Sequence, residues 1–334
     1  MRYLLLLLFF CPTILSAQKT PADFGFKHLP FVFKGDTVNI LLSTDSSTYD
    51  QKKPLFLFVQ GSLPMPLCIY NEAGQHYSTF PFDIRFYLKD YHFAIIGKPG
   101  VPVVTQIEKL KKNRTYVDPT TNAFPRNYCK NNHLDYYVNR NKAVLAFLGQ
   151  KDWVDEEQII VAGHSEGWSI AFKMAIEKAN MSNLILLNAN PTGRILSIII
   201  NERKKEDQTQ SPQAEQFFQY WDYLNQLDTF SDDCSVRDSE KATASFSYPY
   251  MNHLSEIDLP VFVGYGTKDP SVLLIDLFRL EAIRQEKENF HFKSYFGLEH
   301  NFFKVQADGT IDYANDDDFR YDQVAGDFFE WLKK

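Results

Sequence analysis

A serine between two glycines is the stretch of this sequence best suited to chemistry. Gly163-His164-Ser165-Glu166-Gly167 follows the run 158–161, whose β-branched apolar residues are typical of a central strand in a parallel sheet. Apolar residues at helical spacing follow over 168–179. The pattern predicts a strand, a sharp turn and a helix, with Ser165 at the helix N-terminus, where free N–H groups favour negative charge. A flexible Gly/Ser loop is the alternative interpretation.

Asp269 and His300 are the residues that could activate this serine. A serine hydroxyl needs a base to take its proton and an acid to orient that base. Asp269 follows the apolar run 259–265, and His300 follows a predicted strand over 290–296. Because the carboxyl ends of parallel strands meet at one edge of a sheet, we expect Ser165, Asp269 and His300 to meet there.

Other acids and histidines are less suitably placed. Asp258 and His253 precede a strand, His291 lies inside one, and Asp276 falls in a predicted helix. The attack of a serine on a carbonyl also creates an oxyanion, which backbone N–H groups stabilise. The expected donors are Glu166 and, after the buried run 55–59, either Ser62 or Leu63.

These motifs together resemble the α/β-hydrolase superfamily. Gly163-His164-Ser165-Glu166-Gly167, Gly266-Thr267-Lys268-Asp269 and Gly297-Leu298-Glu299-His300 look like its nucleophile elbow, acid turn and histidine loop, in that order. Gly61-Ser62-Leu63-Pro64 and Lys98-Pro99-Gly100 are similar to secreted bacterial members related to the prolyl-oligopeptidase, acyl-peptidase and dienelactone-hydrolase groups. The resemblance implies an α/β fold with a mostly parallel central sheet flanked by helices. This sequence departs from the family pattern at two positions. Gln60 stands where histidine is frequent in the family, and Leu63 stands where a second glycine is frequent.

The order of elements predicts four segments in the chain. Residues 1–17 have the layout of a signal peptide, 18–190 and 259–334 form the two parts of the core, and 191–258 interrupts the alternation of strands and helices. We interpret this interruption as a helical cap over the carboxyl ends of the strands, with a surface insertion as the alternative. A hairpin turn is expected at Gly35-Asp36, and a long polar loop over 101–132.

The N-terminus predicts export to the periplasm or the outside of the cell. A positive residue, Arg2, precedes an apolar run over 4–10, and cleavage is expected after about Ala17. A lipid anchor at Cys11 is disfavoured because the residues before it are large. No later run is long and apolar enough for an integral membrane segment.

Three cysteines remain after such cleavage, which allows one disulfide in an oxidising compartment. We expect Cys68 to pair with Cys129 and leave Cys234 free, or all three to stay unpaired. No spacing of residues resembles a metal site, and no cofactor is expected.

Charge and composition restrict the partners. The formal net charge is −7, and removing Arg2 with the signal peptide makes it −8, which excludes a general binder of nucleic acid. The chain is also rich in aromatic residues, with 29 Phe and 18 Tyr. They are expected in the core, or partly along an apolar substrate pocket.

The sequence thus predicts a secreted serine hydrolase that cleaves a carboxylic ester, a thioester or an amide through an acyl-enzyme. Ser165 would be the nucleophile, His300 the base and then the acid, and Asp269 the orienting carboxylate. A small acyl ester is the favoured substrate and a short peptide the second choice. A catalytically silent binding protein is the rival from another class. The side chain of Glu166 is expected to be exposed, or else to bind a substrate cation. The oligomeric state stays open.

Overall fold

The computed structural model describes residues 19–334 except 78, 189, 210–211 and 235–237. The predicted signal peptide, 1–17, lies outside the described residues. Within the described part of the chain, every helix is too short or too polar to cross a membrane.

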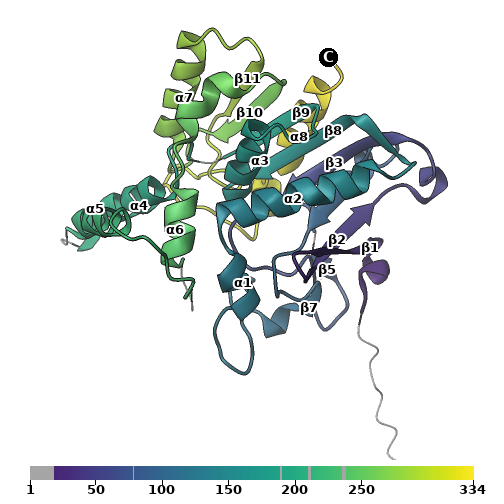
Figure 1. Cartoon of the computed structure of the whole chain (residues 1–334), viewed down its shortest axis with the longest axis horizontal. Helices are drawn as coiled ribbons and strands as arrows, with labels where there is room; N and C mark the ends of the chain where they lie inside the picture. Colours follow the sequence, from purple (N-terminus) through teal and green to yellow (C-terminus); the bar gives the residue numbers. More distant parts are fainter. Residues whose placement is uncertain (1–18, 78, 189, 210–211, 235–237) are drawn as a thin grey trace, which may run out of the picture.

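An eight-stranded sheet forms the centre of the molecule (Figure 1). Its strands, in spatial order, are β1 (Lys27–Phe33), β2 (Asp36–Ser43), β6 (His92–Ile96), β3 (Lys53–Val59), β8 (Val154–His164), β9 (Asn183–Leu187), β10 (Val261–Gly266) and β11 (Phe290–Tyr295). β1 and β2 run antiparallel to their neighbours, and all pairs from β6 to β11 are parallel. The predicted mostly parallel sheet is confirmed.

The first hairpin turns one residue earlier than expected. Phe33 pairs with Asp36, so the two turn residues are Lys34 and Gly35 rather than Gly35 and Asp36. Both have positive φ, 50° and 84°, as a turn matched to the twist of the strands requires.

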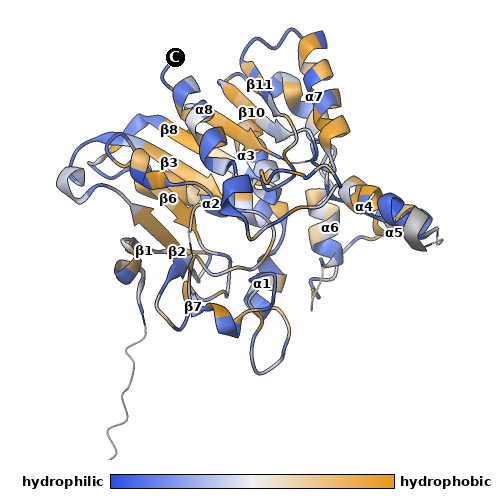
Figure 2. Ribbon diagram, turned by 180° about the vertical axis from the view of Figure 1, so that it is seen from behind, coloured by the Kyte–Doolittle hydropathy of each residue, from blue (hydrophilic) through white to orange (hydrophobic). Residues whose placement is uncertain are grey.

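Helices cover both faces of the sheet, because the central strands β6, β3 and β10 are buried on both faces. Leu55 and Leu57 of β3 face the core that lies under α2 (Leu134–Gly149), α3 (Glu166–Ile176) and α7 (Val272–Arg284). Phe56 and Phe58 face the opposite core, under α8 (Tyr321–Trp331). Figure 2 shows the apolar colour over much of β3, β8 and β10.

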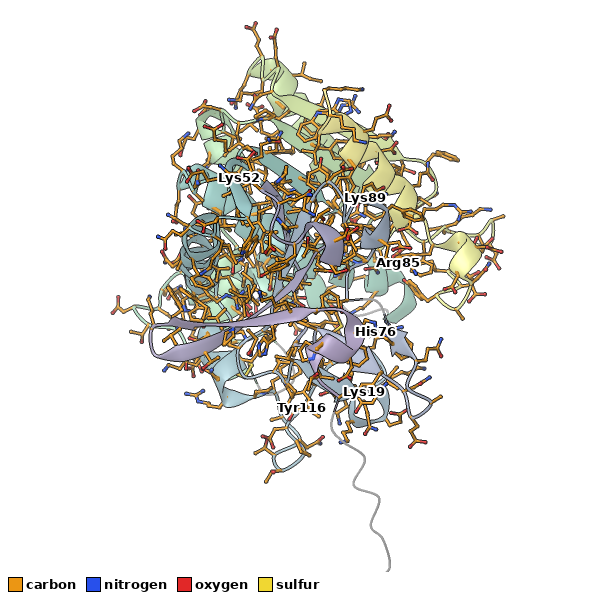
Figure 3. All side chains as sticks on the ribbon, turned by 90° about the vertical axis from the view of Figure 1, so that its right-hand side faces the viewer. Lys19, Lys52, His76, Arg85, Lys89 and Tyr116 are labelled. Carbon is orange, nitrogen blue, oxygen red and sulfur yellow. A yellow bond between two sulfur atoms is a disulfide. The ribbon has the colours of Figure 1, made fainter. Side chains whose placement is uncertain are left out.

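A second, three-stranded sheet occupies the region that follows β3. It consists of β5 (His76–Tyr77), β4 (Cys68–Tyr70) and β7 (Val104–Gln106). The N-terminal segment packs on it: the ring of Phe24 stacks on His76 at 4.5 Å, and Lys19 donates a hydrogen bond to the carbonyl of Gly74. Lys19 and His76 lie in the same part of the molecule in Figure 3.

The segment 101–132 is therefore not the unstructured loop that we expected. It contains β7, a 3-10 turn and the short helix α1 (Arg126–Asn131). Its elements span only three to six residues, too few to show a period in the sequence. The 3-10 turns of the chain are η1 (Pro21–Phe24), η2 (Ser46–Thr48), η3 (Ile84–Phe86), η4 (Ile107–Lys109), η5 (Tyr250–Glu256) and η6 (Asp316–Asp318).

The described residues of the segment 191–258 form the α-helices α4 (Arg194–Thr209), α5 (Gln213–Leu224) and α6 (Glu240–Phe246), besides η5. α4 and α5 pack side by side and project from the body (Figure 1). A disulfide joins Cys234 of this segment to Cys129 of α1, with 5.4 Å between their Cα atoms. The predicted Cys68–Cys129 pair is therefore wrong. Cys68 is buried as a free thiol in the small sheet, away from the segment that carries the partner of Cys129.

Candidate active site

Ser165 lies on the sharp turn between β8 and α3. β8 ends at His164 and α3 begins at Glu166, so this one residue carries the whole change of direction. Its backbone is strained, with φ 57° and ψ −123°, a conformation that costs energy for a residue with a Cβ atom. The turn points Ser165 out of the sheet at the start of a helix.

The two glycines of the motif are there because neighbouring backbone leaves no room for a side chain. A Cβ atom at Gly163 would lie 2.2 Å from the carbonyl oxygen of Gly167. A Cβ atom at Gly167 would lie 1.9 Å from the carbonyl oxygen of Val59 at the end of β3. The tight turn and its packing on the neighbouring strand therefore exclude any larger residue at these positions.

The structure brings Ser165, His300 and Asp269 together in one hydrogen-bonded chain. His300 Nε2 is 3.0 Å from Ser165 Oγ, and His300 Nδ1 is 2.6 Å from Asp269 Oδ2. Asp269 is buried, and its other oxygen accepts the backbone N–H of Ser271 at 2.6 Å. This is the order that proton transfer from a serine requires: a hydroxyl, an imidazole and a carboxylate that fixes the imidazole.

The surroundings of His300 raise its pKa. Burial alone lowers the pKa, but the hydrogen bond to Asp269, the charge of Asp269 and the charge of Glu299 outweigh it. The pKa of His300 is consequently above the ordinary histidine value. A proton taken from Ser165 is thus held more firmly than by a free imidazole.

Two further side chains hold the loop that carries His300. The amide of Asn188 and Nε2 of His164 each donate a hydrogen bond to the backbone carbonyl of His300, both at 2.8 Å. Burial, with the charge of His300, lowers the pKa of His164 to about 3, so His164 is neutral. Asn188 also accepts the N–H of Gly266, and therefore ties the acid turn to the histidine loop.

The loop after β3 lies against the serine. A Cβ atom at Gly61 would be 3.5 Å from the Cβ atom of Ser165. Ser62 lines the same cavity as Ser165, and its carbonyl accepts a hydrogen bond from Tyr128 at 2.7 Å. Leu63 is the next residue of the loop and is partly exposed.

The rival acids and histidines of the sequence analysis lie elsewhere, each with its own partners. Asp258 pairs with Lys178, Asp276 accepts from Tyr265, His253 contacts Tyr248 and Glu256, and His291 packs on Phe262.

Solved structures that superpose on this chain include two peptidases. Dipeptidyl peptidase 4 from Porphyromonas gingivalis matches 83% of this chain and 33% of its own, with a TM-score of 0.51 and 15% identity. The acylaminoacyl peptidase from Pyrococcus horikoshii matches 82% of this chain and 37% of its own, with a TM-score of 0.52 and 10% identity. Est1E from Butyrivibrio proteoclasticus, with ferulic acid bound, matches 82% of this chain and 91% of its own, with a TM-score of 0.51 and 13% identity. The chain has the α/β-hydrolase fold.

The superposition covers only about a third of the two peptidases, so the activity of those whole proteins does not transfer to this chain with the fold. No protein-family model matches the sequence, and neither does any curated protein.

In this α/β-hydrolase fold, Ser165 opens into a cavity of about 520 Å³. The cavity is lined by the serine turn, the acid and histidine loops and residues of α4. Most of the residues that line it have polar side chains, and those from 191–258 and its flank are Asn190, Arg194, Ser197 and Asn201. Phe246 and Tyr313 are the aromatic residues, besides His300, among its described lining.

Few of the described residues that line this cavity are therefore aromatic. The phenylalanines gather instead in the core under α8, where the rings of Phe56, Phe82, Phe93 and Phe328 contact one another. The aromatic excess in the sequence serves packing.

Glu166 is buried, contrary to the exposure expected from the sequence. Its carboxylate binds the ammonium of Lys98 at 2.9 Å, and both side chains are at most 2% exposed. It also pairs with Arg194 of α4, which in turn binds Asp238 at 2.8 Å. A buried charge is tolerated only with partners, and those of Glu166 come from two separate segments. The carboxylate of Glu166 is thus already paired and is not left over for a substrate cation.

Sequence reasoning missed Asn188, His164 and the ion pairs of Glu166. The sequence contained one indication that Asn188 belongs to the site. Asn188 directly follows the apolar strand β9, just as Asp269 comes after β10 and His300 after β11. The partners of Glu166 offered none, since Lys98 and Arg194 stand 68 and 28 residues away in the chain.

Proposed function

We propose that this protein is a serine hydrolase that cleaves a carboxylic ester, a thioester or an amide through an acyl-enzyme. One observation carries the proposal: His300 lies between Ser165 Oγ and the buried carboxylate of Asp269, within hydrogen-bond distance of both. On unrelated folds, this arrangement is the one that turns a serine into a nucleophile.

The proposed reaction has two halves. Ser165 Oγ attacks the carbonyl carbon while His300 takes its proton, and the same proton then passes to the leaving group. The acyl group remains on Ser165 until a water, deprotonated by His300, releases it. The backbone N–H of Glu166 and that of Ser62 or Leu63 would stabilise the oxyanion in each half, and the place of Ser62 in the cavity wall favours Ser62.

Labelling with a fluorophosphonate probe tests the nucleophile. The purified protein should be labelled, and Ser165→Ala should not, because the probe reacts only with an activated serine. Ser169→Ala, which removes another hydroxyl of the same cavity, is the matched control and should still be labelled. Equal labelling of the protein and of Ser165→Ala would refute the assignment. No labelling of either would favour a catalytically silent binding protein.

A small ester is the substrate that we favour, and a short peptide is the second candidate. The peptide is kept because two of the superposed structures are peptidases. A panel of 4-nitrophenyl esters of graded chain length, assayed beside aminoacyl 4-nitroanilides, separates the two. Because most of the residues that line the cavity have polar side chains, we expect short acyl chains to react faster than long ones.

Export through a signal peptide cleaved after about Ala17 also remains a proposal. The Cys129–Cys234 disulfide supports it, because structural disulfides persist mainly in oxidising compartments. N-terminal sequencing of the protein from its native cell would find Gln18 first if the proposal is right.

A further inference from the structure

The cavity wall beside His300 contains a buried carboxylate, Glu299, that takes no direct part in the proton transfers of the proposed mechanism. Glu299 lines the cavity and is only 5% exposed. Its Oε1 accepts the backbone N–H of Asn301 at 2.7 Å and that of Phe303 at 3.0 Å. These two bonds close the turn after His300, so Oε1 is fully occupied by the fold.

The second oxygen, Oε2, is much less occupied. It is 3.4 Å from the hydroxyl of Tyr313 and 3.5 Å from the side-chain amide of Asn301, both at the outer limit of a hydrogen bond. Both of these residues line the same cavity. A carboxylate oxygen accepts two good hydrogen bonds, so Oε2 retains unused capacity on the cavity side.

Glu299 also differs from the other acids of the cavity in its charge balance. Glu166 is paired with Lys98 and Arg194, and Asp269 with His300. For Glu299, no ion pair with a lysine or arginine is formed within the described residues. Besides these residues, the described lining of the cavity contains one more charged residue, Lys268, which is exposed. A buried carboxylate without a cation is costly, and a cation entering the cavity would offset that cost.

We propose that Glu299 binds a protonated amino group of the substrate, so that the acyl group cleaved at Ser165 carries an amine. The inference rests on the proposed hydrolase activity and narrows its substrate class. Because Glu299 lines the same cavity as Ser165 and His300, an amine bound at Glu299 and a carbonyl at Ser165 can belong to one small acyl group. The substrate class is then an aminoacyl ester or amide with a free amino group.

Glu299→Gln separates this role from the closing of the turn. The amide oxygen of Gln accepts the same two backbone N–H groups, whereas the negative charge is lost. The exposed Glu288, just before β11 at the opposite end of that strand, provides a matched control, because Glu288→Gln removes one charge far from the cavity.

The test compares two isosteric acyl groups, alanyl and isobutyryl, each as a 4-nitrophenyl ester and as a 4-nitroanilide. The alanyl group carries an ammonium where the isobutyryl group carries a methyl group. The protein and Glu288→Gln should prefer the alanyl substrate by at least about tenfold in kcat/KM, and Glu299→Gln should lose that preference. The ratio of the two substrates cancels any effect on His300 that is common to both.

Protection against fluorophosphonate labelling gives a second readout, which needs no turnover. Alaninamide should slow the labelling of Ser165, whereas isobutyramide should not, and Glu299→Gln should abolish the difference. Labelling without any preference for the amine would overturn the inference alone. Absence of labelling would overturn the proposed function, and the inference with it.

Discussion

At the scale of single residues, the site depends on how His300 is held and charged. The carboxylate of Asp269 and the donors on the carbonyl of His300 act on different atoms of the same residue. Asp269 sets the protonation of the ring, whereas Asn188 and His164 set its position. Substitutions at these residues should therefore affect different properties of the reaction.

We expect the activity to rise with pH and to reach half of its maximum above pH 6.5. His300 accepts a proton only as the neutral imidazole, and Asp269 and Glu299 raise its pKa against the effect of burial. Asp269→Asn should move the midpoint to lower pH and reduce kcat by roughly 10⁴-fold. The pH dependence of kcat and of kcat/KM on a neutral ester measures both the midpoint and the loss of kcat. Asp312→Asn, an exposed acid, should leave the profile unchanged, and an unmoved midpoint in Asp269→Asn would contradict the assignment.

Asn188→Ala should lower kcat by about ten- to a hundredfold, while the pH midpoint stays close to that of the unaltered protein. The substitution removes a donor from the carbonyl of His300 and the link to Gly266, so the ring is misplaced, but its carboxylate partner remains. Steady-state kinetics across pH tests this. Asn139→Ala, on the exposed face of α2, is the control. A shifted midpoint with normal kcat would show that Asn188 acts in another way.

At the scale of elements, the residues of the site lie on the loops that follow the carboxyl ends of the strands. Apolar runs in the sequence predicted β8 and β10, and alternating phenylalanines predicted β11. The residue types that follow these strands identified Ser165, Asp269 and His300 as candidates. Their meeting follows from the parallel sheet, since all three loops leave it at the same edge. Local patterns of this kind can be recognised from the sequence alone.

The elements that sequence analysis missed depend on contacts between distant segments. The small sheet has strands of two or three residues, which are too short to show a period. Glu166 is buried because Lys98 and Arg194 reach it from separate segments. The partner of Cys129 was missed for the same reason, since Cys234 comes near it only through the packing of 191–258.

Gly167→Ala should destabilise the protein by about 3 kcal/mol or more, because its Cβ atom would overlap the carbonyl of Val59 at 1.9 Å and force β3 and α3 apart. Gly149→Ala is the matched control: its Cβ atom would meet Ile159 at 3.7 Å, an ordinary contact at the end of α2. Urea denaturation of both variants measures the difference. Equal stability of the two would mean that the turn can relax at no cost.

At the scale of the whole molecule, the disulfide joins the segment 191–258 to the core. It links residues 105 apart in the chain and so restricts the unfolded state over a long loop. The cavity-lining residues of 193–201 lie within the loop that the disulfide closes, whereas Phe246 lies beyond it.

We expect the double variant Cys129→Ser and Cys234→Ser to lose about 4 kcal/mol of unfolding free energy, measured in denaturant. Alkylation under denaturing conditions provides the chemical check on the protein that begins at Gln18: one thiol, Cys68, should react before reduction and three afterwards. Cys68→Ala keeps the disulfide and should cost clearly less than the double variant. Unchanged unfolding of the double variant would show that the crosslink adds nothing.

The hydrogen bond between Ser165 and His300 joins residues 135 positions apart, and in the sheet β9 and β10 lie between the strands β8 and β11 that precede them, so we expect the bond to form after these strands have assembled. Contacts of such long range form late in folding, because loop closure must come first. The reactivity of Ser165 therefore marks the end of the folding pathway. A partly folded chain with native helices would have no nucleophile, so recovery of labelling during refolding would time the assembly of the last strands.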